Sequence, residues 1–245
     1  MRALFITGTD TGVGKTHVAT VVLRELQQAG YRTGAYKPVC SGAEIQVDGS
    51  PRWDDLERLA ASLNRPTPID RIGPQRFLAP LAPPLAARAE GSCVDPRGID
   101  DGFLGWRTAC EALVVEGAGG WLCPLTETRS FADWVEQWRF PVLIVARRGL
   151  GTINHTLLTI AAIRSRRLPI IGVILNQSTP QDDDPSVSDN AREIEARSGV
   201  PVLGELLWNQ TELRQGDRAV RMHWWSLMRE PASETGRRAN GESVR

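Results

Sequence analysis

The chain has 245 residues, and its 29 basic residues balance 29 acidic ones at a sequence pI near 6.8. The length suffices for one sizeable α/β domain. The balanced charge gives no basic footprint for nucleic acid or an anionic membrane surface, and no apolar run approaches the ~18 residues of a membrane helix. The four cysteines lie far apart in the sequence, so we expect idle thiols in a reducing cytoplasm, not disulfides or a zinc site.

The start of the chain predicts a phosphate-binding loop between a strand and a helix. An apolar strand over Ala3–Thr7 precedes a glycine-rich turn that ends in Gly14-Lys15-Thr16, and a helix is expected over Thr16–Ala29. In this context, backbone N–H groups of the loop and of the helix N-terminus face phosphate oxygens. Lys15 then neutralises the β- and γ-phosphates, and the Thr16 hydroxyl binds Mg²⁺. The sequence therefore predicts a nucleoside triphosphate site.

The loop also departs from the general pattern for such sites. That pattern has four residues between its two glycines, whereas Gly8 and Gly14 are separated by five. Aligned on the lysine, the first glycine of the pattern falls on Thr9. Asp10 then occupies the position where partition-type ATPases carry a second lysine, and Thr11 lies close to the γ-phosphate.

Apolar runs and helical periodicity alternate along the rest of the chain. The runs predict buried parallel strands over Ala3–Thr7, Thr33–Lys37, Ala112–Glu116, Pro141–Ala146, Pro169–Asn176 and Val202–Leu206. Helices are predicted over Thr16–Ala29, Asp54–Leu63, Leu85–Ala89, Ile99–Cys110, Phe131–Glu136, Ile153–Arg166 and Ser188–Ser198. This alternation predicts a single-domain, doubly wound, mostly parallel sheet flanked by helices, with ligands at the carboxyl ends of its strands.

Three segments do not follow this alternation. The proline-rich stretch Pro66–Pro84 is interpreted as a long surface excursion, and Ser178–Pro185 as a solvated loop. From Glu212 the pattern decays into Arg- and Glu-rich residues. We therefore expect a domain over residues 1–211 and a poorly patterned, partly disordered tail over 212–245.

Polar residues stand at the expected strand ends and at one helix start. Lys37 closes the second strand, Glu116 closes the third and Asn176 the fifth. An acid at Glu116 suits a second Mg²⁺ ligand opposite the loop threonine, and an amide at Asn176 suits contact with a base edge. Asp54 and Asp55 open a helix, where N-terminal capping is the simpler interpretation from the residues alone.

Four blocks in this order resemble the dethiobiotin synthetase family. They are Gly8-Thr9-Asp10-Thr11-x-Val13-Gly14-Lys15-Thr16, Tyr36-Lys37-Pro38-Val39-x-Ser41-Gly42, Val115-Glu116-Gly117-Ala118-Gly119-Gly120-Trp121 and Leu150-Gly151-x-Ile153-Asn154-His155. The resemblance covers roughly residues 2–209. It implies an ATP- and Mg²⁺-dependent ring closure in biotin biosynthesis. The implied substrates are 7,8-diaminononanoate, CO₂ (or bicarbonate) and ATP, which react through a carbamate and a carbamic-phosphoric anhydride.

The resemblance also implies roles for individual residues. Lys37 and Lys15 would be catalytic, and Thr16, Asp54 and Glu116 would bind the metal. The implied nucleotide contacts, besides these metal ligands, are Gly12, Val13, Gly14, Lys15, His17, Gly117, Ala118, Gly119, Asn176, Leu207, Trp208 and Asn209. The implied substrate contacts are Thr11, Lys37, Ser41, Leu150, Gly151 and Asn154, of which the last three would come from the second subunit of a homodimer.

Two alternatives stay open at this point. One is a partition-type switch ATPase, which Asp10 and the lack of a basic or amphipathic tail disfavour. The other is a related ATP-dependent ligase with a different substrate, because a substrate pocket can change while the ATP machinery stays. Arg147 and Arg148 precede the last block, and we expect them to face solvent in preference to the substrate carboxylate.

Overall fold

The alternating pattern folds into one eight-stranded sheet with helices on both faces. The structure is a computed structural model that describes residues 1–180, 184 and 186–232. The strand order is β12-β11-β10-β9-β8-β1-β7-β2. The strands are β1 (Arg2–Gly8), β2 (Thr33–Tyr36), β7 (Ala112–Gly120), β8 (Val142–Arg147), β9 (Ile170–Asn176), β10 (Val202–Leu206), β11 (Leu213–Gln215) and β12 (Arg218–Val220). The pairs from β2 to β10 are parallel, which confirms the predicted fold class.

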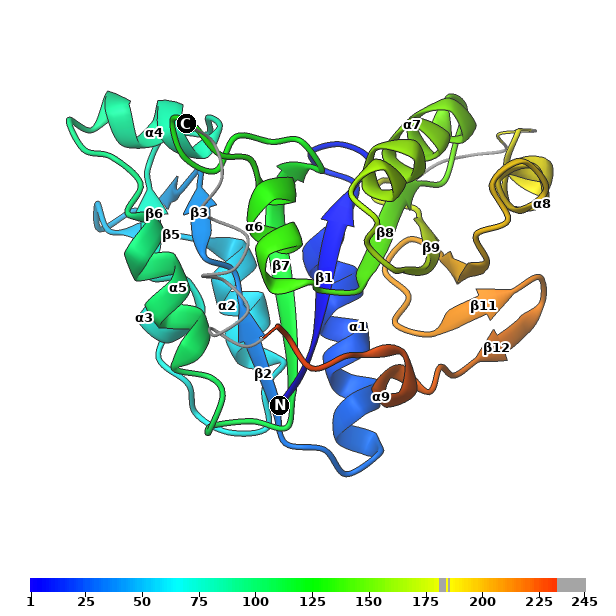
Figure 1. The fold of residues 1–245 in the computed structure, drawn as a ribbon, viewed down its shortest axis with the longest axis horizontal. Helices are drawn as coiled ribbons and strands as arrows, with labels where there is room; N and C mark the ends of the chain where they lie inside the picture. Colours follow the sequence, from blue (N-terminus) through cyan, green and yellow to red (C-terminus); the bar gives the residue numbers. More distant parts are fainter. Residues whose placement is uncertain (181–183, 185, 233–245) are drawn as a thin grey trace, which may run out of the picture.

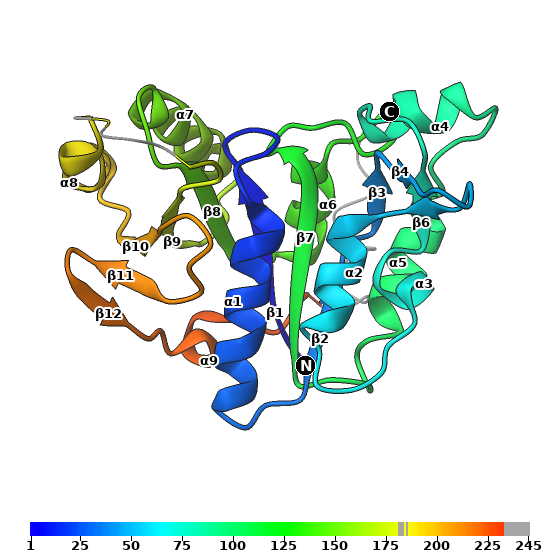
Figure 2. The same cartoon turned by 180° about the vertical axis from the view of Figure 1, so that it is seen from behind.

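The central strand β1 determines where the loop after it emerges. It pairs with β7 on one side and β8 on the other, and every residue from Ala3 to Gly8 is buried. A continuous buried run of this kind is typical of a parallel strand covered on both faces. Figures 1 and 2, which view the sheet from opposite sides, show α1 and α2 over one face and α6 and α7 over the other.

Seven of the described helices match predicted ones apart from shifts at their ends, whereas α3 and α9 were not predicted. They are α1 (Lys15–Gln28), α2 (Asp54–Ala61), α3 (Ile69–Ile72), α4 (Pro83–Ala89), α5 (Pro96–Leu104), α6 (Phe131–Trp138), α7 (Thr152–Ser165), α8 (Val187–Ser198) and α9 (Trp224–Leu227). The largest shift is in α5, which begins three residues before the predicted Ile99 and ends six residues before the predicted Cys110. Asp95 caps it by accepting a hydrogen bond from the Arg97 N–H, and a proline opens its first turn.

The proline-rich excursion contains more structure than its composition indicated. Besides α3 it holds β6 (Gln75–Phe77), which pairs in parallel with β3 (Val39–Ser41) to form a small second sheet. The backbone N–H of Lys37 donates to the Ile72 carbonyl at 2.8 Å. A further short pair joins β4 (Glu44–Ile45) to β5 (Pro51–Arg52) just before α2. These contacts fix the backbone around Lys37 and around the start of α2.

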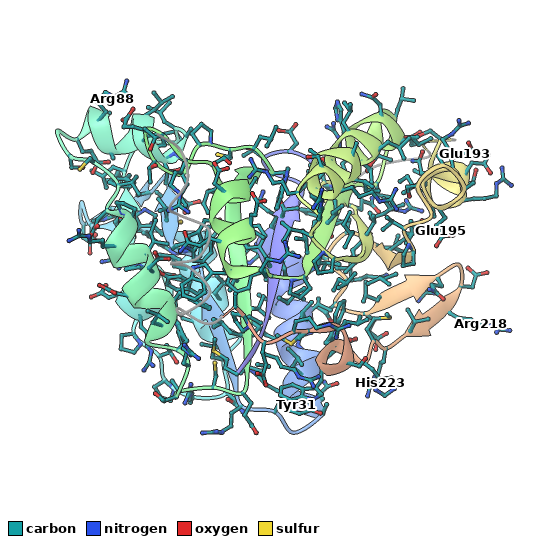
Figure 3. The ribbon with its side chains drawn as sticks, viewed as in Figure 1. Tyr31, Arg88, Glu193, Glu195, Arg218 and His223 are labelled. Atoms are coloured by element: carbon teal, nitrogen blue, oxygen red, sulfur yellow. The ribbon has the colours of Figure 1, made fainter. Side chains whose placement is uncertain are left out.

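The chain also stays ordered beyond Glu212, where the sequence predicted little regular structure. β11 and β12 extend the main sheet as antiparallel strands, and Arg229 forms a bridge with Ala3. Trp224 is buried and its indole N–H donates to Glu25 Oε2 at 2.6 Å. Figure 3 shows Tyr31 and His223 near each other beside α9, at the end of the molecule away from the loop after β1. The predicted loop residues Asp182 and Asp183 and the tail from residue 233 lie outside the described part of the chain.

Among the described residues, no helix combines the length and the apolar character that crossing a bilayer requires.

The contact between α9 and α1 gives a first prediction. Trp224→Ala removes a buried indole and its hydrogen bond to Glu25, so the free energy of unfolding should fall by about 3 kcal/mol in urea titration. The matched control is Trp225→Ala, which removes a partly buried ring stacked on Tyr31 at 4.3 Å and should cost about 1 kcal/mol. Equal losses in the two variants would contradict the burial that distinguishes these tryptophans.

Candidate active site

The loop between β1 and α1 is closed against the sheet by a side chain from β9. Gly14, the N-cap of α1, has φ 90°, and a Cβ there would lie 2.1 Å from Nδ2 of Asn176. That same Nδ2 donates to the Val13 carbonyl at 2.9 Å. Position 14 therefore needs glycine both for its left-handed backbone and for the close approach of Asn176.

The nitrogen and the oxygen of the Asn176 side-chain amide therefore have different roles. The nitrogen Nδ2 is used by the loop, so the oxygen is the end of the amide that could contact a base edge. The oxygen Oδ1 is buried with no hydrogen-bond partner, and Asn176 lines the cavity described below. A buried acceptor without a partner is costly, so this oxygen is available to a donor group of a ligand.

Lys15 lies inside the loop. Its ammonium group donates to the Asp10 carbonyl at 3.1 Å, and its side chain is buried. The pKa of Lys15 is lowered, mainly because burial disfavours the charged form and also because Lys37 is nearby; Glu116 and Asp55 partly oppose this. Asp10 lies at the bend of the loop, and its carboxylate accepts a hydrogen bond from the Thr11 N–H at 2.7 Å. An anion that enters the loop would offset the free-energy cost of burying the charged ammonium group of Lys15.

A buried lysine and two carboxylates meet beside the loop. Lys37 lies at the end of β2, and its ammonium group donates to Oε1 of Glu116 at 2.8 Å and to Oδ2 of Asp55. Thr16 Oγ1 donates to the same Glu116 oxygen at 2.8 Å. Burial by itself lowers the pKa of Lys37, but Glu116 and Asp55 outweigh it and raise this pKa above its ordinary value. Lys37 is therefore a permanent cation at neutral pH.

The structure does not bring Asp54 to this cluster; Asp55 lies there instead. Asp54 accepts a hydrogen bond from Arg52 Nη2 at 3.0 Å and lies 3.9 Å from Arg58 Nη1. The pKa of Asp55 is lowered, because attraction to Lys37 outweighs the opposing effect of burial. Helical spacing could have distinguished the two acids: Asp55 is four residues before the buried Leu59 and so shares the inward face of the helix.

The donor set at this cluster fits Mg²⁺. Thr16, Asp55 and Glu116 offer hydroxyl and carboxylate oxygens, the ligand types that Mg²⁺ prefers. The second carboxylate oxygen of Glu116, Oε2, is buried and has no hydrogen-bond partner in the structure. A cation would satisfy this oxygen, so the residues present match the metal that the sequence implied.

A cavity of about 410 Å³ joins the loop to the cluster, a size suited to a small-molecule ligand. Its walls come from the loop, the strand ends and the segment after β10. Of the residues implied by sequence, the walls include Thr11, Gly12, Gly14, Lys15, Thr16, His17, Lys37, Ser41, Glu116, Ala118, Gly119, Asn176, Trp208 and Asn209. The walls also include four residues that the sequence did not single out for the site, namely Asp55, Arg58, Gln177 and Ser178.

The remaining implied residues do not line this cavity. Leu150, Gly151 and Asn154 lie at the start of α7 and are exposed, with Leu150 79% accessible. Val13, Gly117 and Leu207 are neighbours of lining residues. Arg148 pairs with Glu205 at 2.6 Å, while Arg147 is exposed. Arg147 thus faces solvent as expected, whereas Arg148 pairs with a carboxylate of β10, a strand that β9 separates from β8.

Comparisons with known proteins agree with the site. A family model described as "AAA domain" matches residues 2–213. The ATP-dependent dethiobiotin synthetase BioD of Anaeromyxobacter dehalogenans (strain 2CP-C) is 46% identical over 208 residues, which are 85% of this chain and 91% of that protein. The ATP-dependent dethiobiotin synthetase BioD 1 of Salmonella typhi is 37% identical over 209 residues, covering 84% and 90%. A crystal structure of a ParA family ATPase from Chlorobium tepidum TLS aligns over 85% of each chain at TM-score 0.47 and 15% identity, too low to bear on function.

The approach of Asn176 to the loop gives a prediction for two glycines. Gly14→Ala should weaken ADP binding more than tenfold in calorimetry, because the new Cβ must displace the Asn176 amide and distort the loop. The control is Gly12→Ala, since Gly12 also has a positive φ of 74° but has no atom within 4 Å of a new Cβ. If both variants lose the same affinity, backbone strain alone explains the loss and the contact with Asn176 does not.

Proposed function

Because this chain belongs to the dethiobiotin synthetase family, we propose that it makes dethiobiotin by a ring closure. The substrates of this reaction are 7,8-diaminononanoate, CO₂ and ATP. The observation that supports this most directly is the cluster of Lys37, Glu116 and Asp55, which lies beside the phosphate-binding loop and lines one cavity with it. The cavity thus offers an ATP site and, beside the phosphate-binding loop, the Lys37 ammonium group, which could face a second anion.

The proposed reaction has three steps. One amine of the substrate adds to CO₂ and loses a proton, which forms a carbamate. A carbamate oxygen attacks the γ-phosphorus of ATP, and the bond to ADP breaks with the electron pair leaving on ADP. The second amine attacks the carbamoyl carbon, the carbon–oxygen bond to phosphate breaks, and the amine loses a proton as phosphate leaves.

In this proposal the two lysines offset the charge of two anions that must meet. The carbamate and the γ-phosphate repel each other, and the cost is larger in a partly buried site than in water. Lys15 in the loop serves the phosphates, and Lys37 faces the carbamate. Because Lys37 stays protonated, we infer that it stabilises negative charge and does not accept the amine proton. Phosphoryl transfer depends mainly on such positioning, so no nucleophilic side chain is needed.

Thr16, Glu116 and Asp55 would hold Mg²⁺ in this site, with Asp55 in the role that the sequence assigned to Asp54. When bound, Mg²⁺ supplies positive charge to the phosphate oxygens. Thr11 and Ser41 line the cavity and offer hydroxyl groups for the substrate, although Ser41 Oγ donates to the Leu81 carbonyl at 2.7 Å in the structure.

We further infer that the active protein is a homodimer. Leu150, Gly151 and Asn154 lie outside the cavity of their own chain, so they could reach substrate only in another subunit. Leu122, Leu150 and Leu158 are all more than half exposed, which is unusual for large apolar side chains and suits an interface. A cytoplasmic location is supported by the four cysteines, which are all free thiols.

The reaction itself tests the proposed function. Purified protein with 7,8-diaminononanoate, bicarbonate, Mg²⁺ and ATP should form dethiobiotin and release one phosphate per product, measured by mass spectrometry and a phosphate assay. Lys37→Ala should lower turnover by about a thousandfold while ADP binding changes little, because Lys37 faces the transferred group. Phosphate release that does not depend on the diamine would leave a switch ATPase as the better account.

The choice between the two adjacent aspartates can be measured separately. Asp55→Ala should raise the Mg²⁺ concentration for half-maximal activity at least tenfold, because a carboxylate leaves the cluster around Glu116. Asp54→Ala is the matched control, and its Mg²⁺ requirement should change less than about twofold. A larger effect at position 54 would restore the assignment drawn from the sequence.

A further inference from the structure

Arg58 is a positively charged residue of the cavity wall that has no role in the site as described so far. Arg58 lies on α2, three residues after Asp55, and its side chain lines the cavity together with Lys15 and Thr16. Residues three apart on a helix share a face, so the helix that delivers Asp55 to the Lys37 cluster also presents Arg58 to the cavity. Arg58 is only partly covered, with 44% of its side chain accessible, so a ligand in the cavity can reach it.

Two neighbours hold the guanidinium group of Arg58. Its Nη2 lies 3.5 Å from Nδ1 of His17, and its Nη1 lies 3.9 Å from Asp54. The other ring nitrogen of His17, Nε2, lies 2.7 Å from the Gln210 carbonyl. A carbonyl only accepts, so Nε2 carries the proton and Nδ1 is left as an acceptor toward Arg58. His17 therefore links α1 both to Arg58 and to the segment after β10.

Arg58 and His17 line the cavity together with two residues of the segment after β10. His17 follows Thr16 on α1, and Trp208 and Asn209 line the cavity beside it. In a phosphate-binding loop the lysine serves the β- and γ-phosphates, and the backbone cradles the α- and β-phosphates. The exposed aromatic face of Trp208 is suited to stacking against a base. A nucleotide bound in this way would have its α-phosphate between the loop and Trp208, on the side where His17 connects Arg58 to the segment after β10.

We propose that Arg58 binds the α-phosphate of the nucleotide and that His17 is a positioning residue for Arg58. The inference rests on the proposed function only in requiring that the site takes ATP and releases ADP. The planar fork of arginine matches phosphate oxygens, which makes a stronger contact than its exposed ion pair with Asp54. An incoming phosphate can therefore compete for Arg58 while His17 keeps the guanidinium directed into the cavity.

The test compares ADP with ATP, measured by calorimetry without diamine. Arg58→Ala should weaken both nucleotides about tenfold, because the α-phosphate is common to both. Turnover at saturating ATP should change less than about twofold, since the contact is equal in the ground state and the transition state. The control is Arg24→Ala, which removes the same charge from an exposed position on α1 outside the cavity and should leave both affinities unchanged.

The role of His17 is tested by a double-mutant cycle. His17→Ala should weaken ADP about threefold, and the double variant with Arg58→Ala should bind no more weakly than Arg58→Ala alone. His17→Gln, which keeps both a donor and an acceptor, should restore most of the lost affinity. Additive losses would show that His17 acts on the nucleotide independently, which contradicts a positioning role.

Three results would overturn the proposal for Arg58: a loss for ATP without a loss for ADP, equal losses in Arg24→Ala, or unchanged affinity in Arg58→Ala. These outcomes are separable from a failure of the proposed reaction. ADP binding through Arg58 with no dethiobiotin formed would refute the reaction alone. Dethiobiotin formed with ADP affinity untouched by Arg58→Ala would refute the inference alone.

Discussion

The rest of the site depends on the buried contact between Lys37 and Glu116. Burying either charge alone would cost several kcal/mol, so each requires the other. The sheet provides the pairing: Tyr36 of β2 lies opposite Val115 of β7, and the next residues along the chain are Lys37 and Glu116. The same β7 pairs with β1, where Ile6 lies opposite Glu116, and β1 leads into the phosphate-binding loop. One strand order thus places the lysine, the carboxylate and the loop at one edge.

The loop itself shows how an irregular pattern can keep its physical function. Its first glycine comes one residue earlier than the general pattern allows, yet a side chain there would not fit. A Cβ on Gly8 would lie 2.8 Å from the Asp10 carbonyl and 3.0 Å from Nζ of Lys15. The loop therefore requires glycine at position 8, one residue before the position that the general pattern gives. Lys15 still folds back over the loop.

Most of the fold could be predicted, because the signal for a buried parallel strand is local. Runs such as Ala112–Val115 are apolar without alternation, and the six strands expected from these runs all form. The proline-rich excursion and the segment after Glu212 were harder. Strand β6 spans three residues and is held by pairing with β3, and β11 is held by pairing with β10. Such short strands are specified by their partners, which local composition does not reveal.

By itself, the sequence determined the phosphate-binding loop, the doubly wound sheet, and the presence of Lys37 and Glu116 at strand ends, because each depends on residues close together in the chain. Only the tertiary structure decided which of two adjacent aspartates joins Lys37, and that the Asn176 amide binds the Val13 carbonyl 163 residues away. It also decided that Arg58 meets His17 at the cavity wall. The reason is physical: each of these outcomes depends on the direction of a side chain relative to a distant element, and packing alone sets that direction.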